Sequence, residues 1–209
     1  MSIEARGRIG GLIANSWRGI SYVKAWSSPA QPRTKIQLQI RAWTAYLIRL
    51  WQTIGDTAHD AWNDYAVAHP AIDWTGNPKR LAGVNWYLRC NLRLLQNGLD
   101  IIAAPPAVPA PAAVTDFACS DGVLSSAVTW TPTEGTNLLV EIWVHGPHSK
   151  GLNGSITRAK RISGVPGESG ATALNDLIVA RYTVFCRVID EDTGLASPWV
   201  SDTCDPTAE

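Results

Sequence analysis

Residues 177–188 read LIVARYTVFCRV, and the second half of this stretch identifies the class of fold at the C-terminal end of the chain. Tyr182, Val184, Cys186 and Val188 place large or apolar side chains at every second position. Because the side chains of a β-strand point alternately to the two faces of a sheet, this spacing predicts a strand over residues 180–188 with one face against a core.

The same alternation recurs on both sides of this stretch. Further strands are predicted at residues 114–119, 124–131, 138–145, 155–162, 171–174 and near 199–203. Glycine-containing turn signals separate them, among them Asp121-Gly122 and Thr193-Gly194. About seven short strands in residues 114–209 indicate an antiparallel β-sandwich.

Residues 103–113 read AAPPAVPAPAA and mark the clearest change of composition in the chain. Closely spaced prolines favour an extended, polyproline-like backbone that acts as a semi-rigid spacer. We therefore predict a linker here, between the β-sandwich and an N-terminal module of different structure.

Upstream of the linker, apolar residues recur every three or four positions, which is the period of an amphipathic helix. A first helix is predicted from about residue 35 to 54, with Thr34 as its N-cap and Gly55 at its C-terminal end. A second helix is predicted to start directly afterwards, with a capping box formed by Thr57 and Asp60.

A third helix is predicted over residues 81–97, so that residues 31–102 form a small three-helix module. The chain has ten Trp and two Phe, and several of the Trp residues lie on the helical stripes. Trp combines a large apolar surface with one N–H donor and suits both small cores and interfaces. For regular stripes such as these, packing in a core is favoured over a cofactor site.

Residues 1–30 are rich in glycine and show weak strand alternation. A segment of this kind does not easily bury its aromatic residues in a core of its own. We therefore expect an extended arm that lies on the helices or reaches a neighbouring subunit. The candidate partner-binding residues are Trp17, Arg18, Tyr22, Trp26 and Arg33.

The formal net charge of zero conceals two halves of opposite sign. Residues 1–100 contain 12 Lys and Arg against six Asp and Glu. Residues 101–209 carry an equal excess of acidic residues. Opposite halves indicate two surfaces with different partners. Because the basic residues are spread out, contact with an acidic protein surface is favoured over direct nucleic-acid binding.

Compartment and cysteine usage set further expectations. The sequence has no apolar run of 18 residues and no signal-peptide pattern at its start, so neither a membrane span nor secretion is expected. The four cysteines are scattered and lack metal-ligand spacing, which favours free buried thiols in a reducing compartment. A bridge between Cys119 and Cys204 stays open as an alternative.

Two segments of residues 112–205 carry a family resemblance, one from Leu124 to Pro132 that contains Trp130 and one from Leu177 to Val188 that contains Tyr182. On these segments, residues 112–205 resemble fibronectin type III modules. The first segment resembles the second strand of such modules, with Trp130 in the core, and the second resembles the sixth strand, with Tyr182 at the tyrosine corner. This resemblance implies a fold and says little about function, because such modules bind, space or decorate.

The N-terminal half contains four motifs in a fixed order, at residues 10–23, Gln31-Pro32-Arg33-Thr34, Ala61-Trp62 and residues 81–86. Through these motifs it resembles a group of phage and prophage virion-associated proteins. The chain departs from that pattern at Gln31, Lys35 and Ala82, where Asn, Pro and Ser are usual. The resemblance implies a structural role in a virion and implies no catalysis.

No residues are predicted to be catalytic, to ligate a metal or to bind a cofactor. His145 and His148 lack a third ligand, and residues 190–192 lack the spacing of a calcium loop. The serines lack the G-x-S-x-G pattern of a hydrolase. We therefore expect no enzymatic activity.

Together these features predict a multi-domain α+β protein, with an extended arm (1–30), a three-helix module (31–102), a linker (103–113) and a fibronectin III- or Ig-like β-sandwich (114–209). The expected function is that of a bacteriophage virion structural protein, in capsid decoration or as a neck or tail accessory. Its expected partners are other virion proteins, in a multi-copy assembly without membrane or direct nucleic-acid contact. The alternative is a host-surface or glycan-binding module that uses exposed aromatic residues such as Trp143 or Trp199.

Overall fold

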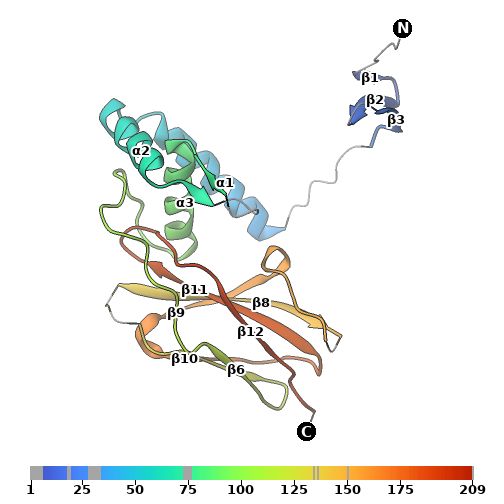
Figure 1. Cartoon of the computed structure of the whole chain (residues 1–209), viewed down its shortest axis with the longest axis vertical. Coiled ribbons are helices and arrows are strands. Elements are labelled where there is room, and N and C mark those ends of the chain that lie inside the picture. The colour runs from blue at the N-terminus through green and yellow to red at the C-terminus, as the bar shows by residue number, and fades with distance from the viewer. Residues whose placement is uncertain are drawn as a thin grey trace. The chain divides into compact units, whose positions relative to one another are not determined.

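A computed structural model describes residues 7–17, 20–27, 34–72, 77–133, 135, 137–149 and 151–208. The chain divides into two compact units, Met1–Gln39 and Ile40–Glu209. The first unit contains an antiparallel sheet of three strands in the order β1-β2-β3 (Figure 1). These strands are β1 (Gly7–Ile9), β2 (Leu12–Trp17) and β3 (Ile20–Ala25). The segment predicted as an extended arm therefore folds back on itself as consecutive hairpins.

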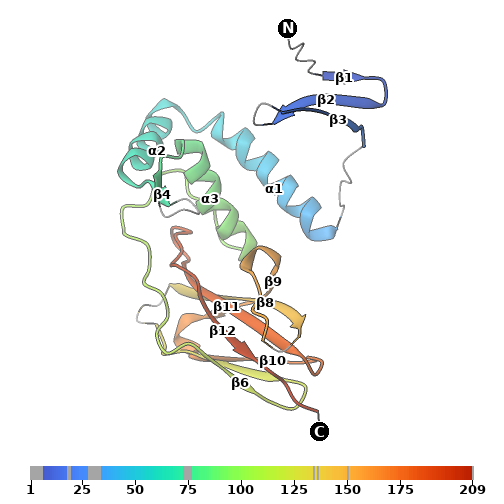
Figure 2. The ribbon, with the colours of Figure 1, turned by 45° about the vertical axis from the view of Figure 1, so that its right-hand side comes forward.

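Three helices follow, at the places that the apolar periodicity predicts (Figure 2). They are α1 (Lys35–Trp51), α2 (Asp56–Ala68) and α3 (Gly83–Gln96). The predicted N-cap of α1 is confirmed, because Thr34 Oγ1 accepts a hydrogen bond from Gln37 N, and Gln37 Oε1 accepts one from Thr34 N.

The predicted capping box of α2 is wrong. The helix begins at Asp56, before Thr57, and its cap is Gly55, which makes no side-chain hydrogen bond. Gly55 has φ 89°, a left-handed conformation that glycine adopts without steric cost, and it lets the chain turn directly into the next helix. The Asp56 carboxylate in the first turn complements the positive end of the helix dipole.

The helices enclose a core built around Trp62, which is fully buried. Leu47, Tyr87 and Cys90 pack in the same cluster. Trp62 meets the ring of Tyr87 edge-on at 5.7 Å, and its indole N–H donates to Ala103 O at 2.8 Å. The preference for a core role is thus confirmed for this Trp, whose one polar atom has found a partner.

The rest of the second unit is antiparallel sheet (Figure 1). A three-stranded sheet, order β10-β7-β6, comprises β6 (Ala118–Asp121), β7 (Ser126–Thr129) and β10 (Ala171–Leu174). A four-stranded sheet, order β12-β11-β8-β9, comprises β8 (Leu138–His148), β9 (Lys160–Pro166), β11 (Arg181–Asp190) and β12 (Val200–Cys204). A short pair, β4 (Ala71–Ile72) and β5 (Pro78–Lys79), precedes α3.

The two larger sheets share one hydrophobic core. The alternating residues of β11 that the sequence places on one face are all buried in it, together with Trp130. The indole N–H of Trp130 donates to Gly167 O at 3.0 Å. The hydroxyl of Tyr182 accepts a hydrogen bond from Ile178 N at 3.2 Å, which is the corner contact that the fibronectin III resemblance implies.

Some strand boundaries differ from those predicted. Residues Ile156–Arg158 form a 3₁₀ helix, and β9 starts only at Lys160. The predicted strand at 114–119 starts later, at Ala118, although Val114 is buried in the core. Val114 thus enters the core without entering a hydrogen-bonded ladder, which alternation alone does not distinguish.

Helix α3 and the four-stranded sheet belong to the same unit and are directly connected. Leu195, from the turn after β11, is buried in the helical core. Arg93 on α3 donates to Gly194 O at 3.1 Å in the same turn. The beginning of the Pro/Ala segment is also tied to α3, through two hydrogen bonds between Asn91 and the backbone of Ile102. The segment predicted as a spacer therefore joins two parts that also pack against each other.

Candidate partner-binding site

The sheet of the first unit has two chemically different faces. The register pairs Leu12 with Ala25 and Ala14 with Val23, so these apolar residues share one face. The opposite face carries Arg8, Ile13, Asn15, Tyr22 and Lys24. The sheet therefore presents one aliphatic face and one basic, aromatic face.

Both faces are accessible. The side chains of Leu12, Val23 and Trp26 are 52%, 63% and 42% exposed. No residue of 7–39 that the structure describes is buried. Such a three-stranded sheet lacks the packed hydrophobic face that normally stabilises it, so partner contact would add stability.

Trp26 is held at the end of β3 by two contacts within the first unit. Its backbone N–H donates to Gly11 O at 2.7 Å. The guanidinium carbon of Arg8 lies 3.9 Å from its ring centroid, in cation–π contact. The indole is thus both oriented and exposed, which is the state expected of an interface anchor.

The predicted partner-binding residues are only partly placed. Tyr22 lies in β3 and Trp26 directly follows that strand, and both are exposed. Trp17 is the last residue of β2. Arg18 and Arg33 lie outside the described residues. Arg8 joins the site as a residue that sequence reasoning missed, because β2 separates its strand from the end of β3 and no local pattern indicates the contact with Trp26.

A second aromatic cluster lies on the face of the four-stranded sheet that points away from the core. The rings of Trp143 and Trp199 meet edge-on at 5.9 Å, and the guanidinium of Arg187 lies 4.4 Å from the Trp199 ring centroid. Both indoles are partly exposed. Trp143 and Trp199 were predicted only as exposed aromatic residues, and the structure brings the two together.

Glu141 lies beneath this cluster and is fully buried. Arg187 and Arg161 donate to its two carboxylate oxygens, and the Trp143 indole N–H donates at 3.3 Å. Burial alone would raise the pKa of the Glu141 carboxyl, but Arg187 and Arg161 outweigh it and hold the pKa below its ordinary value. The carboxylate is therefore charged at neutral pH and orients the aromatic pair.

The two histidines of the His145–His148 stretch lie side by side at the end of β8. His145 and His148 lie with ring centroids 4.4 Å apart, and His145 Nδ1 accepts a hydrogen bond from Ser155 N. Burial, with the neighbouring His148 and Arg158, lowers the pKa of His145. Within the described part of the chain, no three His, Cys, Asp or Glu side chains are grouped so that they could hold a metal ion.

The acidic run after β11 has a structural role. Asp190 Oδ1 accepts hydrogen bonds from the backbone N–H groups of Asp192 and Thr193, and Asp192 accepts one from Asn137. These carboxylates therefore shape the turn that carries Gly194 and Leu195 to helix α3.

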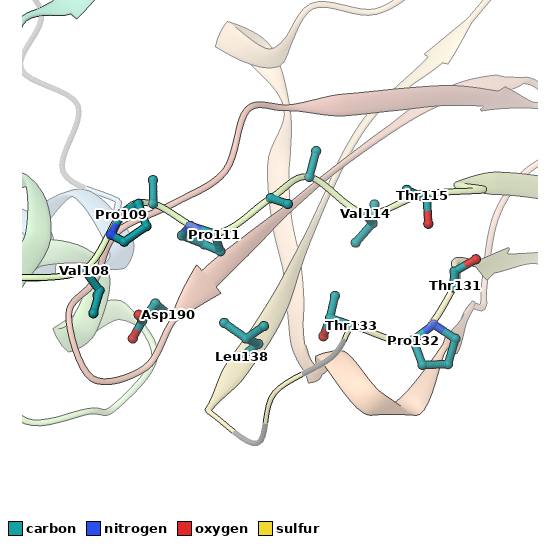
Figure 3. Close-up of a pocket in the computed structure, with 13 residues that line it drawn as sticks. Val108, Pro109, Pro111, Val114, Thr115, Thr131, Pro132, Thr133, Leu138 and Asp190 are labelled. Atoms are coloured by element: carbon teal, nitrogen blue, oxygen red, sulfur yellow. The ribbon is translucent and has the colours of Figure 1, made fainter.

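A groove of about 640 Å³ runs beside the Pro/Ala segment. Figure 3 shows Val108, Pro109 and Pro111 on one side of it, with Leu138 and Thr133 opposite. The polar side chains among its lining residues are those of three threonines and Asp190. This set offers neither a nucleophile–base pair nor a pair of carboxylates for acid–base chemistry.

No protein-family model and no curated protein sequence matches the chain. Among solved structures, it is similar to the fibronectin III domain of human collagen alpha-1(XX), at 24% identity and a TM-score of 0.38 over 50% of this chain and 92% of that one. It is similar to the third fibronectin III domain of the human KIAA0343 protein, at 16% identity and 0.34 over 49% and 86%. A family 76 glycoside hydrolase from a bovine Bacteroides thetaiotaomicron strain shows 19% and 0.38 over 47% of this chain and 21% of that one.

The described helices include none with the length and hydropathy of a membrane span.

Proposed function

We propose that this chain is a non-enzymatic structural protein of a bacteriophage particle, which binds neighbouring virion proteins through its N-terminal sheet. The observation that carries the proposal is the exposure of that sheet on both faces, with Leu12, Val23 and Trp26 as its accessible apolar residues. Apolar surface of this kind favours association, because burying it against a partner removes it from water.

The chemistry of the first unit narrows the class of partner. Residues 1–39 contain six Lys or Arg and a single acidic residue, Glu4. Strands β1 and β3 are the two edges of the sheet and have unpaired backbone groups on their outer sides. The partner that fits is an acidic protein surface with an accessible strand, which would extend the sheet by β-augmentation.

In this proposal residues 114–208 form a fibronectin III-like β-sandwich that projects from the particle or bridges between its components. Support comes from the shared core of the three- and four-stranded sheets, with Trp130 inside it and Tyr182 at the corner. Helix α3 would hold the sandwich in a defined orientation through Arg93 and Leu195.

Deletion of residues 1–28 tests the proposal in purified particles. We expect the truncated chain to fold and to be absent from the particles, as measured by mass-spectrometric copy number. Normal stoichiometry after the deletion would overturn the proposed mode of binding.

A point variant tests the same surface with a matched control. Val23 and Val67 are both valines and are 63% and 53% exposed, but Val23 lies on the N-terminal sheet and Val67 on α2. We expect Val23→Asp to reduce incorporation at least tenfold, because a carboxylate would be buried at the interface. Val67→Asp should incorporate normally, and equal incorporation of the two variants would count against the proposal.

A second candidate function is glycan or host-surface binding, which the Trp143–Trp199 pair favours. Partly exposed indoles beside an arginine provide apolar stacking and hydrogen-bond donors, the chemistry that sugars require. Glycan-array binding of the full chain would test it, with Trp199→Ala expected to abolish binding and Trp26→Ala to leave it unchanged. If the full chain binds no glycan, this second function is excluded. The proposed role in assembly would not be affected.

A further inference from the structure

Cys119 and Cys204 lie on the edges of two different sheets. Cys119 belongs to β6, an edge of the three-stranded sheet, and Cys204 is the last residue of β12, an edge of the four-stranded sheet. These edges are joined by side-chain to backbone hydrogen bonds on either side of the cysteines. Cys119 N donates to Asp202 Oδ2 at 2.8 Å, and Asp205 N donates to Asp121 Oδ1 at 2.6 Å.

The two thiols meet at the margin of the core. Cys204 is 1% exposed and belongs to the core cluster, and Cys119 is partly buried against the same cluster. The two side chains are close enough for each to be the main influence on the other's pKa, and Ser126 also affects the pKa of both. Residues 85 positions apart in the sequence are thereby brought close together by the packing of the two sheets.

Ionisation of this pair differs from that of the other two cysteines. The hydrogen bond from Cys119 lowers the pKa of Cys204 to about 7, while the same contact raises the pKa of Cys119. Burial raises the pKa of Cys90 to about 11 and that of Cys186 to about 12. Because the thiolate is the reactive form in disulfide exchange, the pair Cys119 and Cys204 is more reactive than Cys90 or Cys186.

We propose that Cys119 and Cys204 form a disulfide bond that links β6 to β12 when the chain meets a small disulfide oxidant such as oxidised glutathione. Cys119, the partly exposed member of the pair, loses its proton and attacks one sulfur of the oxidant, which releases a first glutathione thiolate. The second thiol loses its proton and attacks the protein sulfur of the mixed disulfide, which releases a second. Two cysteine thiols are oxidised, and one glutathione disulfide is reduced to two thiols. The free-thiol and bridged forms correspond to a reducing cytoplasm and an oxidising exterior.

The sequence makes this pairing directly measurable, because trypsin places the four cysteines in four different peptides. Cleavage after Lys and Arg gives residues 90–93, 94–150, 182–187 and 188–209, which contain Cys90, Cys119, Cys186 and Cys204 in that order. The native full-length chain is incubated with oxidised glutathione, alkylated in denaturant and digested. We expect peptides 94–150 and 188–209 to be joined, at a mass two hydrogens below their sum, with the other two alkylated.

Thermal unfolding provides a second readout. A bridge that closes a loop of about 85 residues restricts the unfolded chain, so the oxidised protein should melt roughly 5 °C or more above the reduced protein. The Cys119→Ser variant should show neither the joined peptides nor the rise in melting temperature. Cys186→Ala, which removes a buried cysteine outside the pair, should retain both.

Peptide mapping of the unmodified chain tests the pairing of Cys119 with Cys204 even where a variant folds poorly. Recovery of Cys119 and Cys204 as alkylated or singly glutathionylated peptides after oxidation would overturn the proposal. So would a join between either peptide and the one that contains Cys90 or Cys186. These outcomes are independent of the proposed assembly role, which the N-terminal variants test separately.

Discussion

Arg187 and Glu141 are directly opposed neighbours on β11 and β8, and the Arg187 guanidinium donates two hydrogen bonds, of 2.7 and 2.9 Å, to one carboxylate oxygen of Glu141. Arg161 on β9 donates to the other oxygen at 3.1 Å. Asn97, just after α3, contacts both Glu141 and Arg161. One buried carboxylate therefore ties three strands of the sheet to the end of a helix.

Replacing this carboxylate should be costly. We expect Glu141→Ala to lower the free energy of unfolding by about 3–5 kcal/mol, because two arginines would lose their buried counter-charge. The Arg181–Asp205 pair is the matched control, since both of its side chains are partly exposed and screened by solvent. Asp205→Asn should cost less than about 1 kcal/mol. Urea denaturation measures both variants, and equal losses would contradict the role of burial.

Stability should also depend on pH through Glu141. Burial opposes its charge, but Arg187 and Arg161 prevail and hold its folded-state pKa below the value of about 4.3 in an unfolded chain. The unfolded chain therefore binds the proton first as the pH falls. The stabilisation by this group is complete above about pH 4.3 and is lost as the pH falls through the folded pKa.

The measurement compares the native chain with Glu141→Gln by urea denaturation from pH 7 to pH 3. The difference in the free energy of unfolding should be constant near neutrality and should shrink below about pH 4. Glu168→Gln, at an exposed position, is the control and should show no such trend. A difference that grows on acidification would refute the assigned direction of the pKa shift.

Gly194 is required by the contact between the turn after β11 and helix α3. It has φ 67°, and a Cβ there would collide with the carbonyl group of Cys90. Gly98 has φ 74° but faces open space, so it isolates the cost of the backbone conformation. We expect Gly98→Ala to cost about 1 kcal/mol and Gly194→Ala about 2 kcal/mol more. Thermal and urea unfolding would show whether the two variants differ as predicted.

Asn91 should anchor the start of the Pro/Ala segment. It is fully buried, accepts a hydrogen bond from Ile102 N at 2.7 Å and donates one to Ile102 O at 3.1 Å. Asn91→Ala should lower the free energy of unfolding by about 2–4 kcal/mol, because both backbone groups lose their partner. Asn85→Ala, at an exposed site on the same helix, should change it by less than about 0.5 kcal/mol. Faster proteolysis near residue 103 in Asn91→Ala alone would locate the effect.

Local patterns predicted helices and strands well where an element has a single apolar face that packs against a core. The three helices and the strand at 171–174 follow from spacing alone, whereas the core position of Trp130 was an implication of the fibronectin III resemblance. Thr34 was identifiable as a cap because its partner is only three residues away. The start of α2 was missed, because a glycine at positive φ replaces the side-chain cap that Thr57 suggested.

The kinds of residue at the candidate partner-binding site were predictable, but their positions in the structure were predictable only in part. Tyr22 and Trp26 are exposed as an interface would require, while their role in binding stays a prediction. The contact of Arg8 with Trp26 depends on how the chain folds back between β1 and β3, and residue spacing does not encode that geometry.

The alternation of apolar residues within 177–188 is enough to predict which side chains of β11 enter the core. The meeting of Trp143 with Trp199, of Cys119 with Cys204 and of Gly194 with α3 arises only when the sheets and helices pack. The difference is one of range. Periodicity records which face of an element is apolar, whereas contacts between distant residues depend on strand register and on how sheets and helices pack, which no local pattern specifies.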